Sequence, residues 1–169
     1  MTVERAEALR ASERAVAALG GRSVATAESL TAGLVSATLA RIPGVSAILR
    51  GGVTAYCSEV KISVLRVPEA VLDEDGPVQP AVAEAMARGA CEVLGSRFAV
   101  ATTGVAGPGP ADGVPAGTVI VSAHDAGTGL FLTRRLALAG DRDEVRWGAV
   151  VSALGTLAVL AEQTGVAHR

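Results

Sequence analysis

The sequence is poor in the residues on which several classes of protein depend. Aromatic side chains make up 2% of its 169 residues, so a surface that stacks single-stranded bases lacks its flat rings. The 15 basic residues are outnumbered by 17 acidic ones, and no basic run offers attraction to a polyphosphate backbone. We therefore expect no nucleic-acid partner.

Long apolar segments are also missing. Hydrophobic residues make up 50% of the chain. No uninterrupted apolar run, however, approaches the roughly 20 residues that cross a bilayer. The opening residues 1–5 include Glu4 and show neither the apolar core nor the cleavage site of a secretion signal. The sequence predicts a cytoplasmic protein with no membrane partner.

Cysteine is scarce as well. The two cysteines, Cys57 and Cys91, lie far apart and have neither the number nor the spacing of a metal site or a disulfide framework. We interpret both as reduced and structural, with a reservation for Cys57 because of its neighbours. We predict no metal site and no cofactor.

The chain length is usual for one globular domain, so we predict a single domain over residues 1–169. Apolar periodicity, with glycine, proline and capping residues at the boundaries, predicts alternating helices and strands. Helices are expected over 4–19, 31–41, 58–65, 68–74, 80–94 and from Asp141 onward, and strands over 22–27, 48–56, 98–102, 117–123 and 130–138. Ser58 and Asp141 are expected to cap their helices, and Pro80 to open one.

The order of these elements predicts the fold class. A strand, a helix and a second strand at 22–56 read as a βαβ unit, so the first two strands should be parallel. The last two strands are joined by a hairpin at 125–129. We therefore predict an α/β fold, a three-layer α/β/α sandwich around a mixed, mostly parallel five-stranded sheet.

Polar residues interrupt the apolar sequence at TAESLTAGL, residues 26–34, where a strand turns into a helix. Ser29 in this turn is either the N-cap of the helix or a nucleophile beside free backbone N–H groups. In the second case the amides of Leu30, Thr31 or Ala32 would stabilise an oxyanion.

The segment GGVTAYCSEVK offers a base for Ser29, because neither His124 nor His168 is well placed for a Ser-His-Asp triad. Lys61 lies in the first turn of a helix, where the helix dipole and burial lower its pKa, and a neutral lysine can act as a base. Parallel strands would bring Ser29, Tyr56 and Lys61 to one edge of the sheet. Taken singly, Lys61 is more simply a solvated lysine and Tyr56 a half-buried rim residue; together they form a candidate catalytic trio.

Two later segments are candidates for ligand binding. The loop TGVAGPGPADGVPAG, residues 103–117, begins at the end of a strand, and its glycines and amides suit close approach to a phosphate. Such glycine and proline repeats also form plain turns. The segment GDRDEVR places Arg142 and Arg146 one turn apart, either as an ion-paired surface or as contacts to an anionic substrate.

These motifs occur together in a known family. TAES-T-G, GGVTAY-SE-K, TGVAGP, GTV at 117–119 and GDRDEVR resemble, in the same order, the CinA C-terminal family, which includes stand-alone nicotinamide-nucleotide amidases. The resemblance covers residues 6–163. It implies hydrolysis of the carboxamide of nicotinamide mononucleotide to nicotinate mononucleotide and ammonia, in pyridine-nucleotide salvage and without a metal.

The resemblance also implies roles for individual residues. Ser29 would attack the amide carbonyl, Lys61 would take its proton, Tyr56 would relay a proton to the departing ammonia, and water would cleave the acyl-enzyme. Substrate binding is implied for the turn, the glycine-rich loop and the last helix, at Leu30, Thr31, Ala32, Gly33, Thr103, Gly104, Ala106, Gly107 and Arg142. The chain has Leu30 and Ala32 where the family usually has Cys and Gly.

Three functions remain open on the sequence alone. The first is the amidase of nicotinamide mononucleotide, and the second is a small-amide hydrolase with another anionic substrate. The third is a non-catalytic nucleotide-binding or interaction domain of a competence/damage-inducible protein, since domains of this family also occur fused to a larger amino-terminal portion. We expect a small-molecule nucleotide substrate. Because family members assemble through apolar helix faces, we also expect a homo-oligomer.

Overall fold

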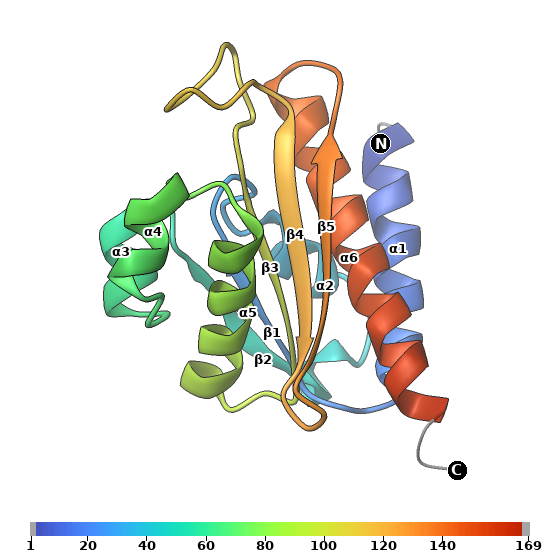
Figure 1. Ribbon diagram of the computed structural model, residues 1–169. Coiled ribbons are helices and arrows are strands. Elements are labelled where there is room, and N and C mark those ends of the chain that lie inside the picture. Colours follow the sequence, from blue (N-terminus) through green and yellow to red (C-terminus); the bar gives the residue numbers. More distant parts are fainter. Residues whose placement is uncertain (1–2, 167–169) are drawn as a thin grey trace.

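A computed structural model describes residues 3–166, which form a five-stranded sheet with helices on both faces (Figure 1). The strands are β1 (Val24–Glu28), β2 (Leu49–Thr54), β3 (Phe98–Gly104), β4 (Thr118–Asp125) and β5 (Leu130–Ala137), in the spatial order β2-β1-β3-β4-β5. β1 pairs in parallel with β2 and β3, whereas β4 pairs antiparallel with β3 and β5. Only β4 therefore runs against the others, which confirms the predicted mixed, mostly parallel sheet.

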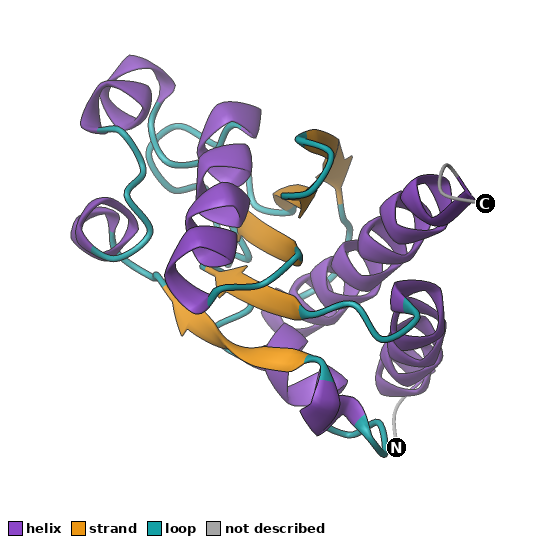
Figure 2. Ribbon diagram, turned by 90° about the horizontal axis from the view of Figure 1, so that it is seen from below, coloured by secondary structure: helices purple, strands orange, loops and turns teal. Residues whose placement is uncertain are grey.

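The helices form the two outer layers (Figure 2). Helices α1 (Val3–Leu19), α2 (Leu34–Leu39) and α6 (Arg142–Val166) lie on one side of the sheet; α3 (Ser58–Ser63), α4 (Glu69–Asp75) and α5 (Pro80–Leu94) lie on the other. Val24 and Val100 point into the core beneath α6, and Ala25 and Ala99 into the core beneath α5. This alternation along β1 and β3 gives the sheet two buried faces, as the three-layer prediction requires.

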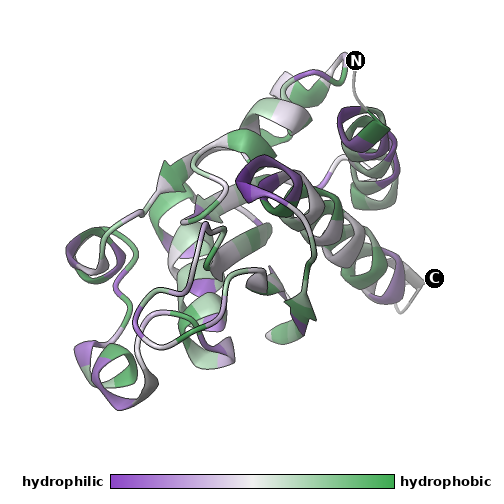
Figure 3. Cartoon of the chain, turned by 90° about the horizontal axis from the view of Figure 1, so that it is seen from above, coloured by the Kyte–Doolittle hydropathy of each residue, from purple (hydrophilic) through white to green (hydrophobic). Residues whose placement is uncertain are grey.

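Helix α6 is the longest of the described helices and is largely apolar. Its stretch Arg142–Gly165 is long and apolar enough to cross a membrane by those two measures alone. Within the fold, 56% of its apolar window is buried, and α6 packs against α1 and the sheet, which is typical of a core helix. Figure 3 shows hydrophilic colouring at both ends of α6, with mostly apolar colouring between them.

Helix α2 departs most from the prediction. It was expected over residues 31–41 but begins at Leu34. Ala32 and Gly33 have φ angles of 49° and 94°, and a right-handed helix cannot include residues in this left-handed region. The polar turn that follows β1 is therefore longer than expected, from Ser29 to Gly33.

The helix caps agree with the prediction at one place and differ at another. Asp141 caps α6, because its Oδ1 accepts hydrogen bonds from the amides of Asp143 and Glu144 at 2.8 and 3.0 Å. Ser58 was expected to cap α3, but Cys57 holds the N-cap position there, without a side-chain capping bond.

Gly89 sets the distance between α5 and the chain that follows α3. A Cβ atom at Gly89 would lie 1.9 Å from the carbonyl oxygen of Leu65. Gly155, which also lies inside a helix, would place a Cβ atom where nothing lies within 4 Å. The two positions thus form a matched pair of helical glycines.

We expect Gly89→Ala to lower the free energy of unfolding by about 2 kcal/mol or more, because α5 and the segment after α3 must move apart. Gly155→Ala should raise it by up to about 1 kcal/mol, because alanine favours the helix and restricts the unfolded chain. Urea unfolding of both variants measures the difference. A Gly89→Ala protein as stable as the wild type would show that this close approach is not needed.

Candidate active site

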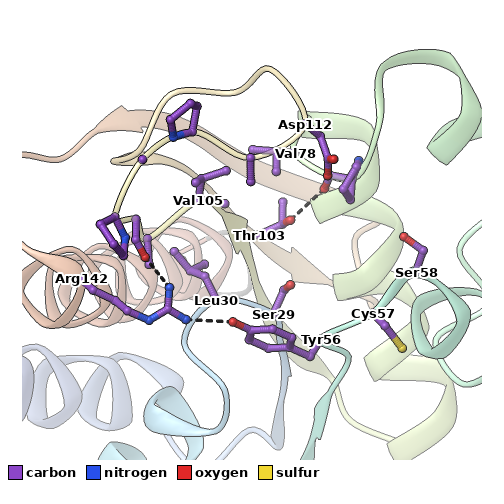
Figure 4. Close-up of a pocket in the computed structure, with 18 of the residues that line it drawn as sticks. Ser29, Leu30, Tyr56, Cys57, Ser58, Val78, Thr103, Val105, Asp112 and Arg142 are labelled. Carbon is purple, nitrogen blue, oxygen red and sulfur yellow. Dashed lines mark hydrogen bonds between the residues drawn. The ribbon is translucent and has the colours of Figure 1, made fainter.

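A cavity of about 350 Å³ opens where the carboxyl ends of the parallel strands meet (Figure 4). The register places Glu28, the last residue of β1, beside Thr54 of β2 and Thr102 of β3. The residues that follow these strands line the cavity, together with residues 103–112 and the start of α6. Its volume is within the range of small-molecule sites.

Ser29 and Lys61 are in direct contact in this cavity. The Nζ atom of Lys61 lies 3.2 Å from the Oγ atom of Ser29. The same nitrogen donates to the carbonyl oxygens of Ala55 at 2.9 Å and Tyr56 at 3.3 Å. Lys61 is 2% exposed and Ser29 is 8% exposed, so the pair is buried at the base of the site.

The surroundings of Lys61 favour its neutral form. Burial lowers the pKa of the Lys61 ammonium from its ordinary value of 10.5, and the nearby Cys57 and Glu59 only oppose this effect. In the described part of the chain, no carboxylate forms an ion pair with Lys61. A neutral amine has two N–H bonds and one lone pair. In that form the carbonyls of Ala55 and Tyr56 accept the two N–H bonds, which would leave the lone pair for Ser29.

The buried carboxylate of Glu28, which is 1% exposed, organises the turn around Ser29. It accepts five hydrogen bonds: Oε1 from the Thr26 hydroxyl (3.0 Å) and the Ser36 amide (2.8 Å), and Oε2 from the Thr31 hydroxyl (2.8 Å) and the amides of Gly33 (2.9 Å) and Val35 (3.0 Å). These donors compensate the burial of the charge. This role was not predicted from the sequence, although a carboxylate at the end of a strand rich in small and apolar residues was a visible signal.

Tyr56 and Arg142 meet at the cavity (Figure 4). The Nη2 atom of Arg142 donates to the Tyr56 hydroxyl at 2.9 Å, and Nη1 donates to the carbonyl oxygen of Gly107 at 2.5 Å. The hydroxyl of Tyr56 therefore faces Arg142, while the carbonyl of the same residue contacts Lys61. Arg142 links α6, the glycine-rich loop and the segment after β2, and provides a cation at the cavity.

Most of the residues predicted for the site line this one cavity. Besides the trio, the lining includes Leu30, Thr103, Gly104, Ala106, Gly107 and Arg142. Thr31, Ala32 and Gly33 belong to the same turn but do not line the cavity. Their predicted contribution to substrate binding stays a prediction.

Several other residues lie differently from what the sequence suggested. Arg146 does not line the cavity; it donates instead to the carbonyl oxygens of Leu30 and Thr31. His124 is not in the lining either, and His168 lies outside the described residues. Asp112 does line the cavity, and it was not predicted to do so because nothing in the sequence but its place in the loop marks it.

Comparisons with known sequences agree with this fold and site. A family model described as the CinA C-terminal domain matches residues 8–161. A CinA-like protein of Frankia casuarinae is 46% identical over 132 residues, which cover 78% of this chain and 30% of that protein. A CinA-like protein of Mycolicibacterium gilvum is 46% identical over 137 residues, covering 79% and 32%. The chain thus spans about three tenths of the length of these curated relatives.

Solved structures show the same architecture. The competence/damage inducible protein CihA from Agrobacterium tumefaciens is 33% identical with a TM-score of 0.82, covering 89% of this chain and 94% of that one. A CinA superfamily protein from Klebsiella pneumoniae is 31% identical with a TM-score of 0.86, covering 92% and 98%. With the family model matching nearly the whole described chain, the protein belongs to the CinA family of competence/damage-inducible proteins and has the fold of its C-terminal domain.

Proposed function

We propose that this chain is an amidohydrolase, and specifically a nicotinamide-nucleotide amidase. The observation that carries the proposal is the 3.2 Å contact between the Ser29 hydroxyl and the buried amine of Lys61. Lys61 is the only lysine in the sequence, and all the other residues among the 15 Lys and Arg are arginines. Arginine stays protonated at all working pH values, so of these two residue types only lysine can accept a proton.

The reaction divides into two halves. Lys61 takes the proton of Ser29 as its Oγ atom attacks the carboxamide carbon, and the C–N bond then breaks as a proton passes to the departing ammonia. Water attacks the acyl-enzyme, Lys61 takes a proton from it, and the proton returns to Ser29. A relay through Tyr56 requires its hydroxyl to exchange the contact with Arg142 for one with the leaving group.

The cavity also supports an anionic, nucleotide-sized substrate. Arg142 is exposed to the cavity, and its planar guanidinium suits bidentate contact with a phosphate. The loop of residues 104–110 lies beside it, with glycines at 104, 107 and 109 that permit close approach of a ligand. We assign the phosphate of nicotinamide mononucleotide to Arg142 and its carboxamide to Ser29.

The direct test is ammonia release from nicotinamide mononucleotide by the purified chain, with Ser29→Ala as the blank. Ser58→Ala is the matched control, because Ser58 also lines the cavity but is not the hydroxyl bonded to Lys61. We expect release by the wild type and by Ser58→Ala, and none by Ser29→Ala. If the wild type binds the nucleotide without releasing ammonia, the domain is a non-catalytic nucleotide-binding module instead.

A further inference from the structure

Arg146 contacts the turn after Ser29 and has no role in the proposed reaction as described above. From the second turn of α6, its Nε atom donates to the carbonyl oxygen of Leu30 at 3.1 Å, and Nη2 donates to that of Thr31 at 3.2 Å. Its exposed ion pair with Asp143, at 3.6 Å, involves the remaining nitrogen. The guanidinium therefore joins α6 to the two residues that follow Ser29.

Because the peptide group is planar, a contact that fixes a carbonyl also fixes the direction of the N–H of the following residue. The carbonyl of one residue and the N–H of the next point in opposite directions across a planar trans peptide. Because the Leu30 carbonyl points to Arg146, the Thr31 N–H points away from it. The Ser29 carbonyl accepts the Ala32 amide at 3.0 Å, which likewise directs the Leu30 N–H away from Ala32.

The remaining amides of the turn are already in use. The Ser29 amide donates to the Thr102 carbonyl, the Ala32 amide to the Ser29 carbonyl and the Leu34 amide to the Thr31 carbonyl. The amides of Gly33, Val35 and Ser36 all donate to the Glu28 carboxylate. Within the described residues, the amides of Leu30 and Thr31 alone in this stretch have no acceptor. Buried backbone N–H groups are rarely left without one. Of these two residues Leu30 lines the cavity, so its amide is available for a ligand atom there.

We propose that Arg146 is a positioning residue: by holding the Thr31 carbonyl it directs the Ala32 amide to the Ser29 carbonyl, and this contact orients the Leu30 amide as the oxyanion site for chemistry at Ser29. Its bond to the Leu30 carbonyl holds the neighbouring peptide plane in place. Glu28 completes the arrangement by fixing the opposite end of the turn. Donors that are oriented before the reaction stabilise a developing oxyanion most strongly. The inference rests on the proposed function in that Ser29 is the nucleophile, but not on the identity of the amide.

The test uses Ser29 itself and needs no natural substrate. A small alkyl fluorophosphonate phosphonylates an activated serine: the P–O bond to Ser29 forms, fluoride leaves, and the serine proton passes to Lys61. The charge that develops on the phosphoryl oxygen requires the same Leu30 amide. The rate of labelling of Ser29, followed by intact mass, therefore reports the oxyanion site.

We expect Arg146→Lys to slow this labelling at least about tenfold, because an ammonium cannot hold two carbonyls with the fixed fork of a guanidinium. Asp143→Asn removes the exposed ion pair but leaves both carbonyl contacts, so its labelling rate should stay within about twofold of the wild type. Circular dichroism and thermal unfolding confirm that each variant is folded at the assay temperature. Glu28→Gln, if folded, should slow labelling as Arg146→Lys does.

The outcomes separate this inference from the proposed function. A folded Arg146→Lys protein that is labelled as fast as the wild type overturns the role of Arg146, whatever the amidase assay shows. A wild type whose Ser29 is not labelled at all overturns it too. If labelling slows as expected but no ammonia is released from the mononucleotide, the positioning role stands and the proposed substrate is wrong.

Discussion

Lys61→Met should lower kcat for amide hydrolysis by about 10³-fold or more and leave KM nearly unchanged, because in the proposed mechanism Lys61 accepts the proton of Ser29, which it contacts. Methionine has a similar length and no charge, so it fits the buried position of a side chain that is 2% exposed. Steady-state ammonia release at saturating substrate measures the loss.

Lys61→Arg separates a proton acceptor from a mere positive charge. Arginine keeps the charge but stays protonated, so this variant should be as inactive as Lys61→Met. Activity retained in Lys61→Arg would contradict the assignment of Lys61 as the base and would favour an electrostatic role.

The pH dependence follows from the same residue. Because burial lowers the pKa of Lys61, kcat/KM should rise with pH and level off below the ordinary lysine value of 10.5. Stability should change in the same sense: between the folded and unfolded pKa values the unfolded chain binds more protons, so the free energy of unfolding increases with pH. Lys61→Met should remove this increase.

The sequence offers a direct measurement of that pKa. Since Lys61 is the only lysine, a protein made with lysine labelled with carbon-13 at Cε shows a single lysine side-chain resonance. Its titration should have a midpoint below 10.5 and should match the rise in kcat/KM. A midpoint at or above the ordinary value would show that Lys61 is charged at neutral pH and would remove the basis of the mechanism.

Arg142→Ala should raise KM for nicotinamide mononucleotide by about 10–100-fold and change KM for the corresponding nucleoside little, because a phosphate contact of a charged group contributes about 1.5–3 kcal/mol. The comparison of the two substrates isolates the phosphate. It also distinguishes the mononucleotide from another anionic amide as the substrate.

Two controls make the Arg142 experiment specific. Arg134→Ala removes an exposed arginine of β5, which does not line the cavity, and should leave both KM values unchanged. Arg142 also bonds to Tyr56, so kcat for the nucleoside reports any effect on that residue. An equal rise in KM for nucleotide and nucleoside would show that Arg142 shapes the cavity rather than binding the phosphate.

The sequence predicted the class of fold and the location of the site through local patterns. Apolar periodicity, Pro80, Asp141 and the glycine breaks mark helices and strands within a few residues, because they act over one or two turns. The order of those elements then implies parallel strands with a shared carboxyl edge. Ser29 and Lys61, separated by 32 positions, meet there as predicted.

The roles of Glu28 and Arg146 could not be obtained in this way. Arg146 lies 116 positions from Leu30, and its place one turn after Arg142 gives no sign that it faces the serine turn. Glu28 was visible as an interruption of an apolar strand, but its five partners come from both sides of a turn whose two left-handed residues were not predicted. Long-range partners depend on how helices pack, which local patterns do not encode.

The sequence by itself therefore determined the order of the elements, the strand ends and the residue types available for chemistry, because these depend on neighbours along the chain. Only the tertiary structure decided which of those residues are buried and what they contact. Burial lowers the pKa of Lys61, and the carbonyl contacts of Arg146 set the direction of two backbone amides. Both effects require segments far apart in the sequence to exclude water together.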